Sequence, residues 1–474
     1  KKNMLFFQFC LSIRLRTWFQ DKTPNDEIVS ASYETFDQYI DHFNNSNLDR
    51  FKQRYLANNQ YYKQNGPLLI MIGGEGELSP KFLDGGYSIS YFAKELGGFQ
   101  LALEHRYYGK SLPFADLSDM RYLSSKQALA DLAEFVAFAK KKFNLKNSKV
   151  VVIGGSYSGN LAGWARSQFP FAIDAAIATS GPSLGLVDFK QYMSHVEQVL
   201  QGIDAKCFTQ TKKALQKAFK LLTEDKARFA QIFNATLPDQ MTPDDLGAVE
   251  SFLSYDLVGN TQYYDAPGFD NSDYPGTLQE QCAQQFGNLP EEATDEEIML
   301  AYATKNQLGR FGMISYQAQI DQLRDVNPED SAGRSWTYQT CTEFGYYQPA
   351  DHTVFGPHNT LQSQLKMCKD VFFAGLSEEE SAKMVDEQVD FTNAWFGARN
   401  QPRDHIIYTN GKIDPWSELS VVKELGWKDG QYIPEGSETI WIPEGSHCTD
   451  LYMRWKINDG VRQKQLEKLN EWIK

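Results

Sequence analysis

The sequence predicts an α/β fold with a mostly parallel sheet and a large helical insertion. Three observations support this prediction. Short apolar segments alternate with amphipathic helical segments over residues 66–185, which is typical of a parallel sheet covered on both faces. Over residues 187–399 the chain is mostly polar, helical in pattern and rich in loops. Strand-like segments return near residue 400.

The first part of the sheet is predicted from four apolar segments that end in glycine-rich or polar loops. They are PLLIMIGGEGEL (67–78), FQLALEHRYYG (99–109), KVVVIGG (149–155) and IDAAIATSGP (173–182). Residues 124–143 begin with a serine cap and carry apolar side chains at helical spacing, so we expect a helix there. A second helix is expected in LAGWARSQFP, where Pro170 would end it.

The insertion and the return to the sheet are predicted in the same way. Thr294-x-x-Glu297 and Ser377-x-x-Glu380 have the spacing of capping boxes that open helices. DHIIYTNGKIDPW and ETIWIPEGSH then read as strands followed by loops, and VRQKQLEKLNEWIK reads as a final helix. The expected parts are a signal segment (1–20), an α/β domain (21–186 and 400–474) and a helical insertion (187–399).

Composition excludes several classes of partner. The chain has 474 residues, is 42% hydrophobic and has a formal net charge of −14. A negative surface repels phosphate backbones and anionic lipid, so nucleic acid and membrane surfaces are not expected partners. No later segment has the length of apolar sequence that a membrane span needs. The six cysteines form no C-x-x-C pair, and we expect neither a metal nor a cofactor.

The N-terminal segment and the cysteines favour the secretory pathway. LFFQFCLSI, which contains Cys10, resembles the core of a signal peptide, although a plain amphipathic start is the alternative. Four central cysteines lie within one part of the chain, which suits an oxidising compartment. Asn44 and Asn234 begin N-x-S/T triplets and are candidate glycosylation sites. We expect a lysosomal, vacuolar or extracellular protein.

Ser156 is the candidate nucleophile. It follows an apolar strand within VVVIGGSYSGN, where a sharp strand-to-helix turn needs small residues two positions before and after the serine. Gly154 and Ser158 fill those positions, with serine where the usual motif has its last glycine. Taken alone, the segment also fits an ordinary turn that closes a strand.

Two downstream residues complete a catalytic pattern. A serine hydroxyl attacks efficiently only when a histidine removes its proton and a carboxylate orients that histidine. Asp414 lies in the loop after one late strand and His447 in the loop after the next, in the chain order Ser, Asp, His. Since parallel strands present such loops at one edge of a sheet, the three residues are predicted to meet there.

An oxyanion hole is expected beside the nucleophile. One donor would be the backbone N–H of Tyr157, the residue after the serine. A second would come from GGEGE (73–77), through Gly74 or Glu75. The alternatives are that this loop is a glycine turn near no ligand, or that Glu75 and Glu77 orient a charged end of the substrate.

Several long motifs occur in one order from about residue 33 to the C-terminus. They are YIDHFN, FKQRY, GGEGELSP, ALEHRYYGKSLPF, YLSSKQALADLAEF, GGSYSGNLAGWARSQFP, YQTCTEFGYYQ, NGKIDPW and GSHCTDLY. With these motifs the sequence resembles the serine peptidase family of lysosomal Pro-Xaa carboxypeptidase, dipeptidyl peptidase II and thymus-specific serine protease. GGSYSGNLAGW and YQTCTEFGYYQ resemble the thymus-specific branch most.

The resemblance implies an α/β-hydrolase domain with an inserted, disulfide-bonded helical cap, and a homodimer. It assigns the nucleophile to Ser156, the acid partner to Asp414 and the base to His447. It further implies that Trp416 walls the S1 pocket, where a flat apolar surface suits a proline ring. Other implied roles are substrate contact by Glu343 and Tyr346, with cap structure as the alternative, and two disulfides, Cys207–Cys282 and Cys341–Cys368.

Two residues depart from the family pattern. The carboxypeptidase member has methionine four residues after the nucleophile, in its proline pocket, where this chain has Asn160. A polar side chain at this substrate-binding position puts a strict proline preference in doubt. Cys448, next to the base, would be left without a disulfide partner, and we interpret it as a buried free thiol.

The predicted function is a serine peptidase that hydrolyses short peptides through an acyl-enzyme. A helical lid favours exopeptidase action, with some preference for proline next to the scissile bond. Two alternatives stay open: another α/β hydrolase such as an esterase, and a catalytically silent protein that binds peptides. The order of residues does not distinguish carboxypeptidase, dipeptidyl peptidase and endopeptidase modes.

Overall fold

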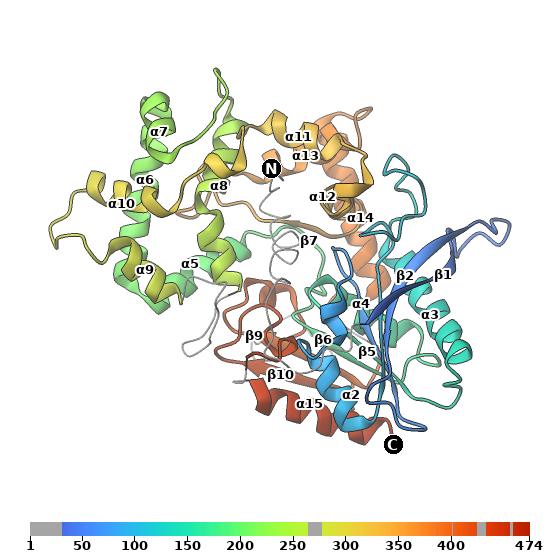
Figure 1. Cartoon of the computed structure of the whole chain (residues 1–474). Helices are drawn as coiled ribbons and strands as arrows, with labels where there is room; N and C mark the ends of the chain where they lie inside the picture. The colour runs from blue at the N-terminus through green and yellow to red at the C-terminus, as the bar shows by residue number, and fades with distance from the viewer. Residues whose placement is uncertain (1–30, 264–276, 401, 424–432, 456–457) are drawn as a thin grey trace. The chain divides into compact units, whose positions relative to one another are not determined.

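The computed structural model describes residues 31–263, 277–400, 402–423, 433–455 and 458–474 (Figure 1). The expected signal segment and Cys10 lie outside these residues. Two compact units make up the described chain. One, the sheet unit, contains residues 31–185, 326–339 and 389–474, and the other, the helical unit, contains residues 186–325 and 340–388.

The sheet unit is built on an eight-stranded sheet, counted over the described residues, in the order β1-β2-β4-β3-β5-β6-β9-β10. The strands are β1 (Ser32–Tyr39), β2 (Arg50–Asn58), β3 (Leu68–Ile72), β4 (Phe99–Leu103), β5 (Val150–Gly155), β6 (Ala175–Thr179), β9 (Ile406–Gly411) and β10 (Glu438–Ile442). The β1–β2 and β2–β4 pairs are antiparallel and every later pair is parallel. The mostly parallel sheet predicted from the sequence is confirmed.

The parallel strands were predictable because both of their faces are covered. Every residue of β3, β4 and β6 is buried, so each strand reads as a continuous apolar run. In contrast, most residues of β1 are exposed or half-buried, with Phe36 and Gln38 buried, and the strand has the polar sequence SYETFDQY. The sequence analysis predicted no strand at β1, which forms the edge of the sheet, or at β2 beside it, because these antiparallel strands lack such an apolar run.

Two pairs of helices pack on the sheet. In one pair α2 (Ser88–Leu96) contacts α15 (Asp459–Trp472), and in the other α3 (Ser125–Lys142) contacts α4 (Tyr157–Gln168) (Figure 1). The predicted serine cap of α3 is Ser124, whose side chain accepts a hydrogen bond from the Gln127 N–H at 3.3 Å. Gln168 is the last residue of α4, so this helix ends two residues before Pro170.

Residues 326–339 belong to the sheet unit, which differs from the single insertion expected over 187–399. Helix α12 (Ser331–Gln339) is fixed there by hydrogen bonds. The Ser335 hydroxyl donates to the Tyr107 carbonyl at 3.0 Å, and Arg334 Nε donates to the Leu117 carbonyl at 3.1 Å. The sequence pattern is helical on both sides of this segment, so periodicity could not show which unit α12 joins.

The helical unit contains a two-stranded sheet and a set of helices. Its elements are β7 (Leu186–Asp188), α5 (Gln191–Ile203), α6 (Ala205–Glu224), α7 (Lys226–Phe233), α8 (Pro243–Gln262), α9 (Leu278–Phe286), α10 (Asp295–Lys305), α11 (Tyr316–Arg324), β8 (Gly345–Tyr347) and α13 (Leu361–Val371). The predicted capping box of Thr294 and Glu297 opens α10. Ser377 and Glu380 exchange the corresponding bonds at the start of α14 (Glu378–Phe396).

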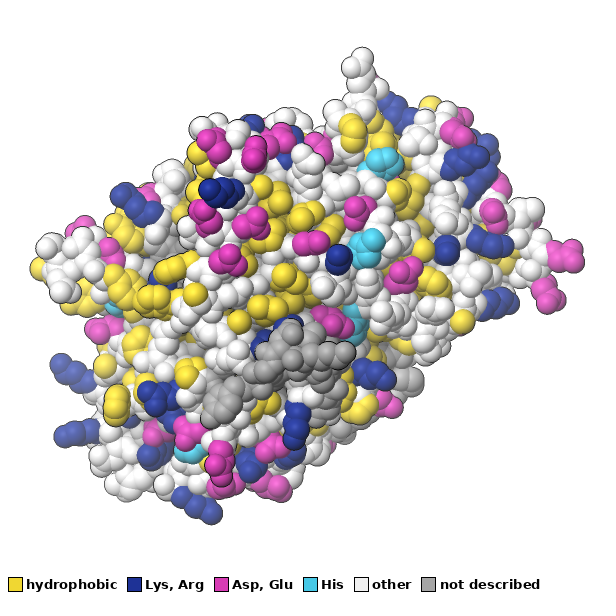
Figure 2. Space-filling model, turned by 180° about the vertical axis from the view of Figure 1, so that it is seen from behind, with side chains coloured by type: hydrophobic (Ala, Val, Ile, Leu, Met, Phe, Trp, Pro, Cys, Tyr) yellow, Lys and Arg dark blue, Asp and Glu magenta, His cyan; other side chains and the backbone are white. Residues whose placement is uncertain are grey.

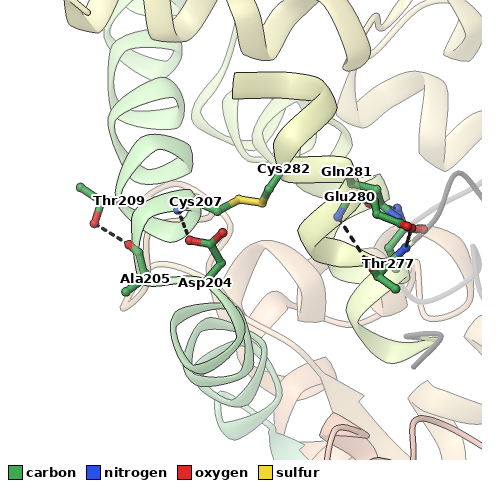
Figure 3. Close-up of a disulfide and its surroundings, with 9 residues drawn as sticks. Asp204, Ala205, Cys207, Thr209, Thr277, Glu280, Gln281 and Cys282 are labelled. Atoms are coloured by element: carbon green, nitrogen blue, oxygen red, sulfur yellow. Dashed lines mark hydrogen bonds between the residues drawn. A yellow bond between two sulfur atoms is a disulfide. The ribbon is translucent and has the colours of Figure 1, made fainter. Parts of the chain in front are cut away.

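Two disulfides cross-link the helical unit. Cys207, near the start of α6, pairs with Cys282 on α9 (Figure 3), and Cys341 pairs with Cys368 on α13. The Cα atoms are 5.8 Å and 5.7 Å apart, within the usual range for disulfides. Both pairs are those that the family resemblance implied.

The surface carries charges of both signs. On the face drawn in Figure 2, acidic and basic side chains are interspersed with uncharged ones. Among the helices of the described chain, none has the length and apolar character to cross a bilayer.

Candidate active site

Ser156 lies in a strained turn between β5 and α4. Its backbone angles are φ 60° and ψ −133°, a conformation that non-glycine residues rarely adopt and that functional sites often retain. The turn is held on both sides, because the Ser156 N–H donates to the Thr179 carbonyl at 2.9 Å and its carbonyl accepts from the Gly159 N–H at 2.8 Å. Ser156 is partly exposed, whereas Tyr157 after it is buried.

The turn tolerates serine at position 158 but needs glycine at two other positions. A Cβ atom at Gly154 would lie 1.9 Å from the Ser158 carbonyl oxygen, and one at Gly159 would lie 2.5 Å from the Thr179 carbonyl oxygen. The Ser158 hydroxyl instead donates to the Gly155 carbonyl at 2.7 Å and accepts from the Gly155 N–H at 3.1 Å. Serine therefore adds hydrogen bonds to the turn where the usual motif has glycine.

Asp414 and His447 form a buried pair at the ends of β9 and β10. Nδ1 of His447 lies 2.8 Å from Oδ2 of Asp414, and the two side chains are 1% and 0% exposed. The other carboxylate oxygen accepts from the Trp416 backbone N–H at 3.0 Å. Both oxygens of Asp414 are thus occupied, which fixes the orientation of the imidazole ring.

The electrostatic environment favours a proton on His447. Burial alone would lower the pKa of this imidazole, but the Asp414 charge and hydrogen bond, together with Cys448, raise the pKa well above its usual value. An imidazole that accepts a proton from a reacting hydroxyl becomes positively charged. The carboxylate of Asp414 would stabilise that charge.

The loops that carry Ser156 and His447 meet at one edge of the sheet. A Cβ atom at Gly155 would lie 2.9 Å from Sγ of Cys448, so the residue before the serine lies against the residue after the histidine. The Cys448 N–H also donates to the Ser180 hydroxyl at 3.0 Å. Cys448 is a buried free thiol, which confirms the interpretation from sequence, and burial raises its pKa.

The glycine-rich loop after β3 lies beside the same turn. A Cβ atom at Gly74 would be 3.6 Å from the Ser158 hydroxyl oxygen. Glu75 as a whole residue is partly exposed, but its carboxyl group is buried. Burial raises the pKa of this carboxyl to about 7, although a backbone hydrogen bond and the charge of His447 act to lower the pKa. Glu77 lies in an ion pair with Arg54 at 3.0 Å, and Arg54 also pairs with Glu104.

A buried histidine holds the side chain of Tyr157. Nδ1 of His105 lies 2.7 Å from the Arg106 carbonyl oxygen, so Nδ1 carries the proton and Nε2 is an acceptor. The Tyr157 hydroxyl donates to Nε2 at 2.9 Å. Burial lowers the pKa of His105 to about 4, although the bond to Arg106 opposes the shift, so the ring is neutral at neutral pH.

Helix α12 and the start of α3 contribute to the same set of bonds. Gln339 Nε2 donates to the Tyr157 hydroxyl oxygen at 3.0 Å, and the Ser125 hydroxyl lies 3.1 Å from it. The Gln339 amide oxygen accepts from the Tyr108 hydroxyl at 2.7 Å. These contacts hold the residue that follows Ser156, and therefore the direction of its backbone N–H.

The expected substrate-binding residues differ in their surroundings. The Trp416 ring centroid lies 6.5 Å from that of His447, beside the candidate base. Asn160 is 1% exposed, and its amide donates to the Pro182 carbonyl at 3.1 Å. Glu343 and Tyr346 are buried in the helical unit, and contact of these two residues with substrate stays a prediction.

The sequence analysis missed the roles of His105 and Gln339. Both lie in motifs quoted for the family resemblance, LEHRYY and YQTC. A histidine two residues after a buried strand was the available signal, but its partner at Tyr157 is 52 residues away. Among the described residues, no group of three or more His, Cys, Asp or Glu side chains is arranged to hold a metal ion.

Comparison with known proteins finds one matching family profile and several relatives over most of the chain. The profile of the serine carboxypeptidase S28 family matches residues 38–462. Thymus-specific serine protease is 32% identical in Mus musculus (92% of this chain and 87% of that protein covered) and 30% identical in Homo sapiens (92% and 86%). Lysosomal Pro-X carboxypeptidase of Homo sapiens is 26% identical, with 94% of this chain and 89% of that protein covered.

Proposed function

Because the chain belongs to the serine carboxypeptidase S28 family, and is therefore a serine-type peptidase, we propose that Ser156, His447 and Asp414 are its catalytic triad. The observation that carries the proposal is the buried His447–Asp414 pair. The loop that carries His447 contacts Gly155, the residue before Ser156, through Cys448. The strained backbone of Ser156 supports its role as the nucleophile.

The proposed reaction proceeds through an acyl-enzyme. The Ser156 hydroxyl oxygen attacks the scissile carbonyl carbon while Nε2 of His447 takes the hydroxyl proton. Asp414 keeps the proton of Nδ1 in place and stabilises the imidazolium. His447 then gives its proton to the leaving amine, and water hydrolyses the ester by the same steps. The oxyanion would be bound by the Tyr157 N–H and by an N–H of Gly74 or Glu75.

We further propose exopeptidase action on short peptides, with some preference for proline beside the scissile bond. The Trp416 ring next to His447 provides a flat apolar surface that suits a proline ring. One relative is named lysosomal Pro-X carboxypeptidase. The Asn160 amide is committed to the Pro182 carbonyl, so its polarity need not disfavour an apolar side chain in the pocket.

A fluorophosphonate probe tests the nucleophile. Such probes phosphonylate activated serines, and we expect one adduct, on Ser156, in the folded chain. S156A and H447A should lose labelling and lower kcat by about 10⁴-fold or more, with unchanged circular dichroism. C448A is the matched control and should still be labelled, because the thiol is not the attacking group. Absence of an adduct on Ser156 in folded protein would instead support a silent peptide-binding protein.

Product analysis tests the specificity. Mass spectrometry of products from a peptide library with proline at varied positions should show loss of terminal residues or dipeptides next to proline. Aryl esters offered beside the peptides distinguish an esterase, which would show the higher kcat/KM on the esters. Cleavage at internal bonds of long peptides would contradict the exopeptidase proposal.

The chain is also proposed to pass through the secretory pathway. The two disulfides of the helical unit require an oxidising compartment, and Asn44 and Asn234 are both exposed, as glycan acceptors must be. Expression in a secreting eukaryotic cell should give two N-glycans. N44Q and N234Q should each increase the electrophoretic mobility of the protein by the shift of one glycan, and glycosidase treatment should remove the same shift from the wild type. An unchanged mobility in either variant would exclude that site.

A further inference from the structure

A small cavity is lined only by residues of the helical unit, none of which is assigned to catalysis. Its walls come from α8, α11, α13 and the segment after β8. The centres of water molecules can occupy about 50 Å³ of it, whereas one water needs about 10–15 Å³ by the same measure. The cavity therefore has room for a few waters or for one small organic group.

Gln348, which lines this cavity, carries an unusual polar group. The residue is 2% exposed, and neither the nitrogen nor the oxygen of its side-chain amide has a hydrogen-bond partner among the described residues. Leaving a buried polar group unmatched costs about 1–3 kcal/mol, and buried amides are nearly always paired. A methionine would have filled the same space without that cost.

The surroundings hold the Gln348 backbone in place but do not satisfy its side chain. The Gln348 N–H donates to Oε1 of Gln364 at 2.9 Å, and Nε2 of Gln364 donates to Oδ1 of Asn359 at 2.8 Å. These two neighbouring amides are therefore matched to each other and to the main chain. The side-chain amide of Gln348 can therefore donate a hydrogen bond to a ligand from Nε2 and accept one from it at Oε1.

The remaining walls favour an uncharged ligand with a short alkyl arm. Phe252, Tyr316 and Met367 line the cavity and are each less than a tenth exposed. Asp244 also lines it, but its carboxylate belongs to a cluster of two acids and two lysines: Lys366 lies 3.6 Å from Asp244 and 2.9 Å from Asp370, and Lys369 lies 3.1 Å from Asp370. The charge of Asp244 is thus compensated, and no uncompensated charge in these walls would attract an ion.

We propose that this cavity binds a primary carboxamide, such as the side-chain amide of glutamine or asparagine in a peptide or an amidated peptide terminus. A primary carboxamide has an N–H on the same side as its carbonyl oxygen, so it can donate to Oε1 and accept from Nε2 of Gln348 at once. A trans peptide group has these atoms on opposite sides. A carboxylate has no donor and would bring a buried charge.

Ligand-observed NMR with the full chain tests the proposal, using propionamide as the probe. We expect saturable binding of propionamide, and binding at least about tenfold weaker for propionate and N,N-dimethylpropionamide, which each lose one of the two bonds. Q348M should weaken propionamide binding by at least about tenfold. The matched control Q317L changes an exposed glutamine on the same helix, α11, as Tyr316 and should bind like the wild type.

Equal binding of propionamide and propionate by the wild-type chain would overturn the proposal, as would undiminished binding by Q348M. Binding of none of the three probes would show that the cavity holds water only. If Q348M fails to fold, the comparison of the three probes on the wild-type chain still decides. Because binding rather than hydrolysis is measured, the outcome is independent of the proposed triad.

Discussion

Asp450 is a buried carboxyl beneath the candidate active site. Its Oδ2 accepts from the Thr179 hydroxyl at 3.0 Å and from the Gln465 amide at 2.7 Å, and the residue is 1% exposed. Burial raises its pKa to about 6, although these hydrogen bonds and Arg462 oppose the shift. The folded chain therefore binds this proton more tightly than the unfolded chain does.

The raised pKa of Asp450 predicts a pH-dependent contribution to stability. This contribution is complete below the unfolded pKa near 4 and is lost as the pH rises to about 6, a difference of about 3 kcal/mol. D450N should flatten the change in free energy of unfolding between pH 4 and pH 7, measured by urea unfolding at each pH. The control D390N, at an exposed position on α14, should keep the wild-type slope, and a wild-type slope in D450N would contradict the prediction.

At the scale of elements, α12 couples a segment remote in sequence to the catalytic turn. Gln339, its last residue, donates to the hydroxyl of Tyr157 across 182 residues of sequence. His105 accepts from the same hydroxyl. The backbone N–H of Tyr157, the proposed oxyanion donor, is therefore positioned by a helix and a strand end that touch no reacting atom.

Removing this hydroxyl should impair catalysis rather than substrate binding. Y157F would leave the buried acceptor of His105 and the donor of Gln339 unmatched and loosen the turn. We expect kcat to fall by about 10- to 100-fold with little change in KM, when rates are divided by the active fraction titrated with a fluorophosphonate. A change confined to the active fraction would indicate a purely structural role.

Tyr408 offers a matched control for that variant. Its hydroxyl is also buried, in β9, but has no hydrogen-bond partner among the residues that the structure describes. Y408F should therefore leave kcat and KM unchanged and should not lower the melting temperature. A loss of kcat in Y408F equal to that in Y157F would show that any hydroxyl removed from this core has the same effect.

At the scale of the whole molecule, both disulfides lie within one of the two units. Cys207 and Cys282 are 75 residues apart, and Cys341 and Cys368 are 27 residues apart. Closing a loop restricts the unfolded chain more when the loop is longer, which predicts contributions of about 4–5 and 3–4 kcal/mol respectively. The sheet unit contains neither bond.

Calorimetry can separate these contributions. The double variant C207S/C282S should lower the unfolding temperature of the helical unit more than C341S/C368S does. The transition of the sheet unit should stay within about 2 °C of its wild-type value, because surface and remote changes have small effects there. An equal shift of every transition in both variants would show that the two units unfold together.

Elements whose signal lies within their own short segment of sequence were predicted, whereas features that depend on contacts with other segments were not. Continuous apolar runs predicted β3, β4, β5 and β6, and capping residues predicted the starts of α3 and α10. The polar, mostly unburied β1 gave no such signal, and the position of α12 depended on contacts rather than on its own periodicity. Among the site residues, Ser156, Asp414 and His447 were predicted because each follows an apolar strand in the expected chain order.

The sequence by itself determined the buried parallel strands, the caps of α3 and α10 and the chain order of the candidate triad, because these depend on side-chain spacing along the chain. Only the tertiary structure decided that Ser158 bonds to the catalytic turn, that Glu77 is paired with Arg54, and that Gln339 and His105 hold Tyr157. It also decided that Gln348 lines a cavity and that its amide has no hydrogen-bond partner among the described residues. Apart from the Ser158 bonds, which join residues three positions apart, these contacts join segments distant in sequence, and burial and hydrogen-bond satisfaction exist only once the segments are packed together.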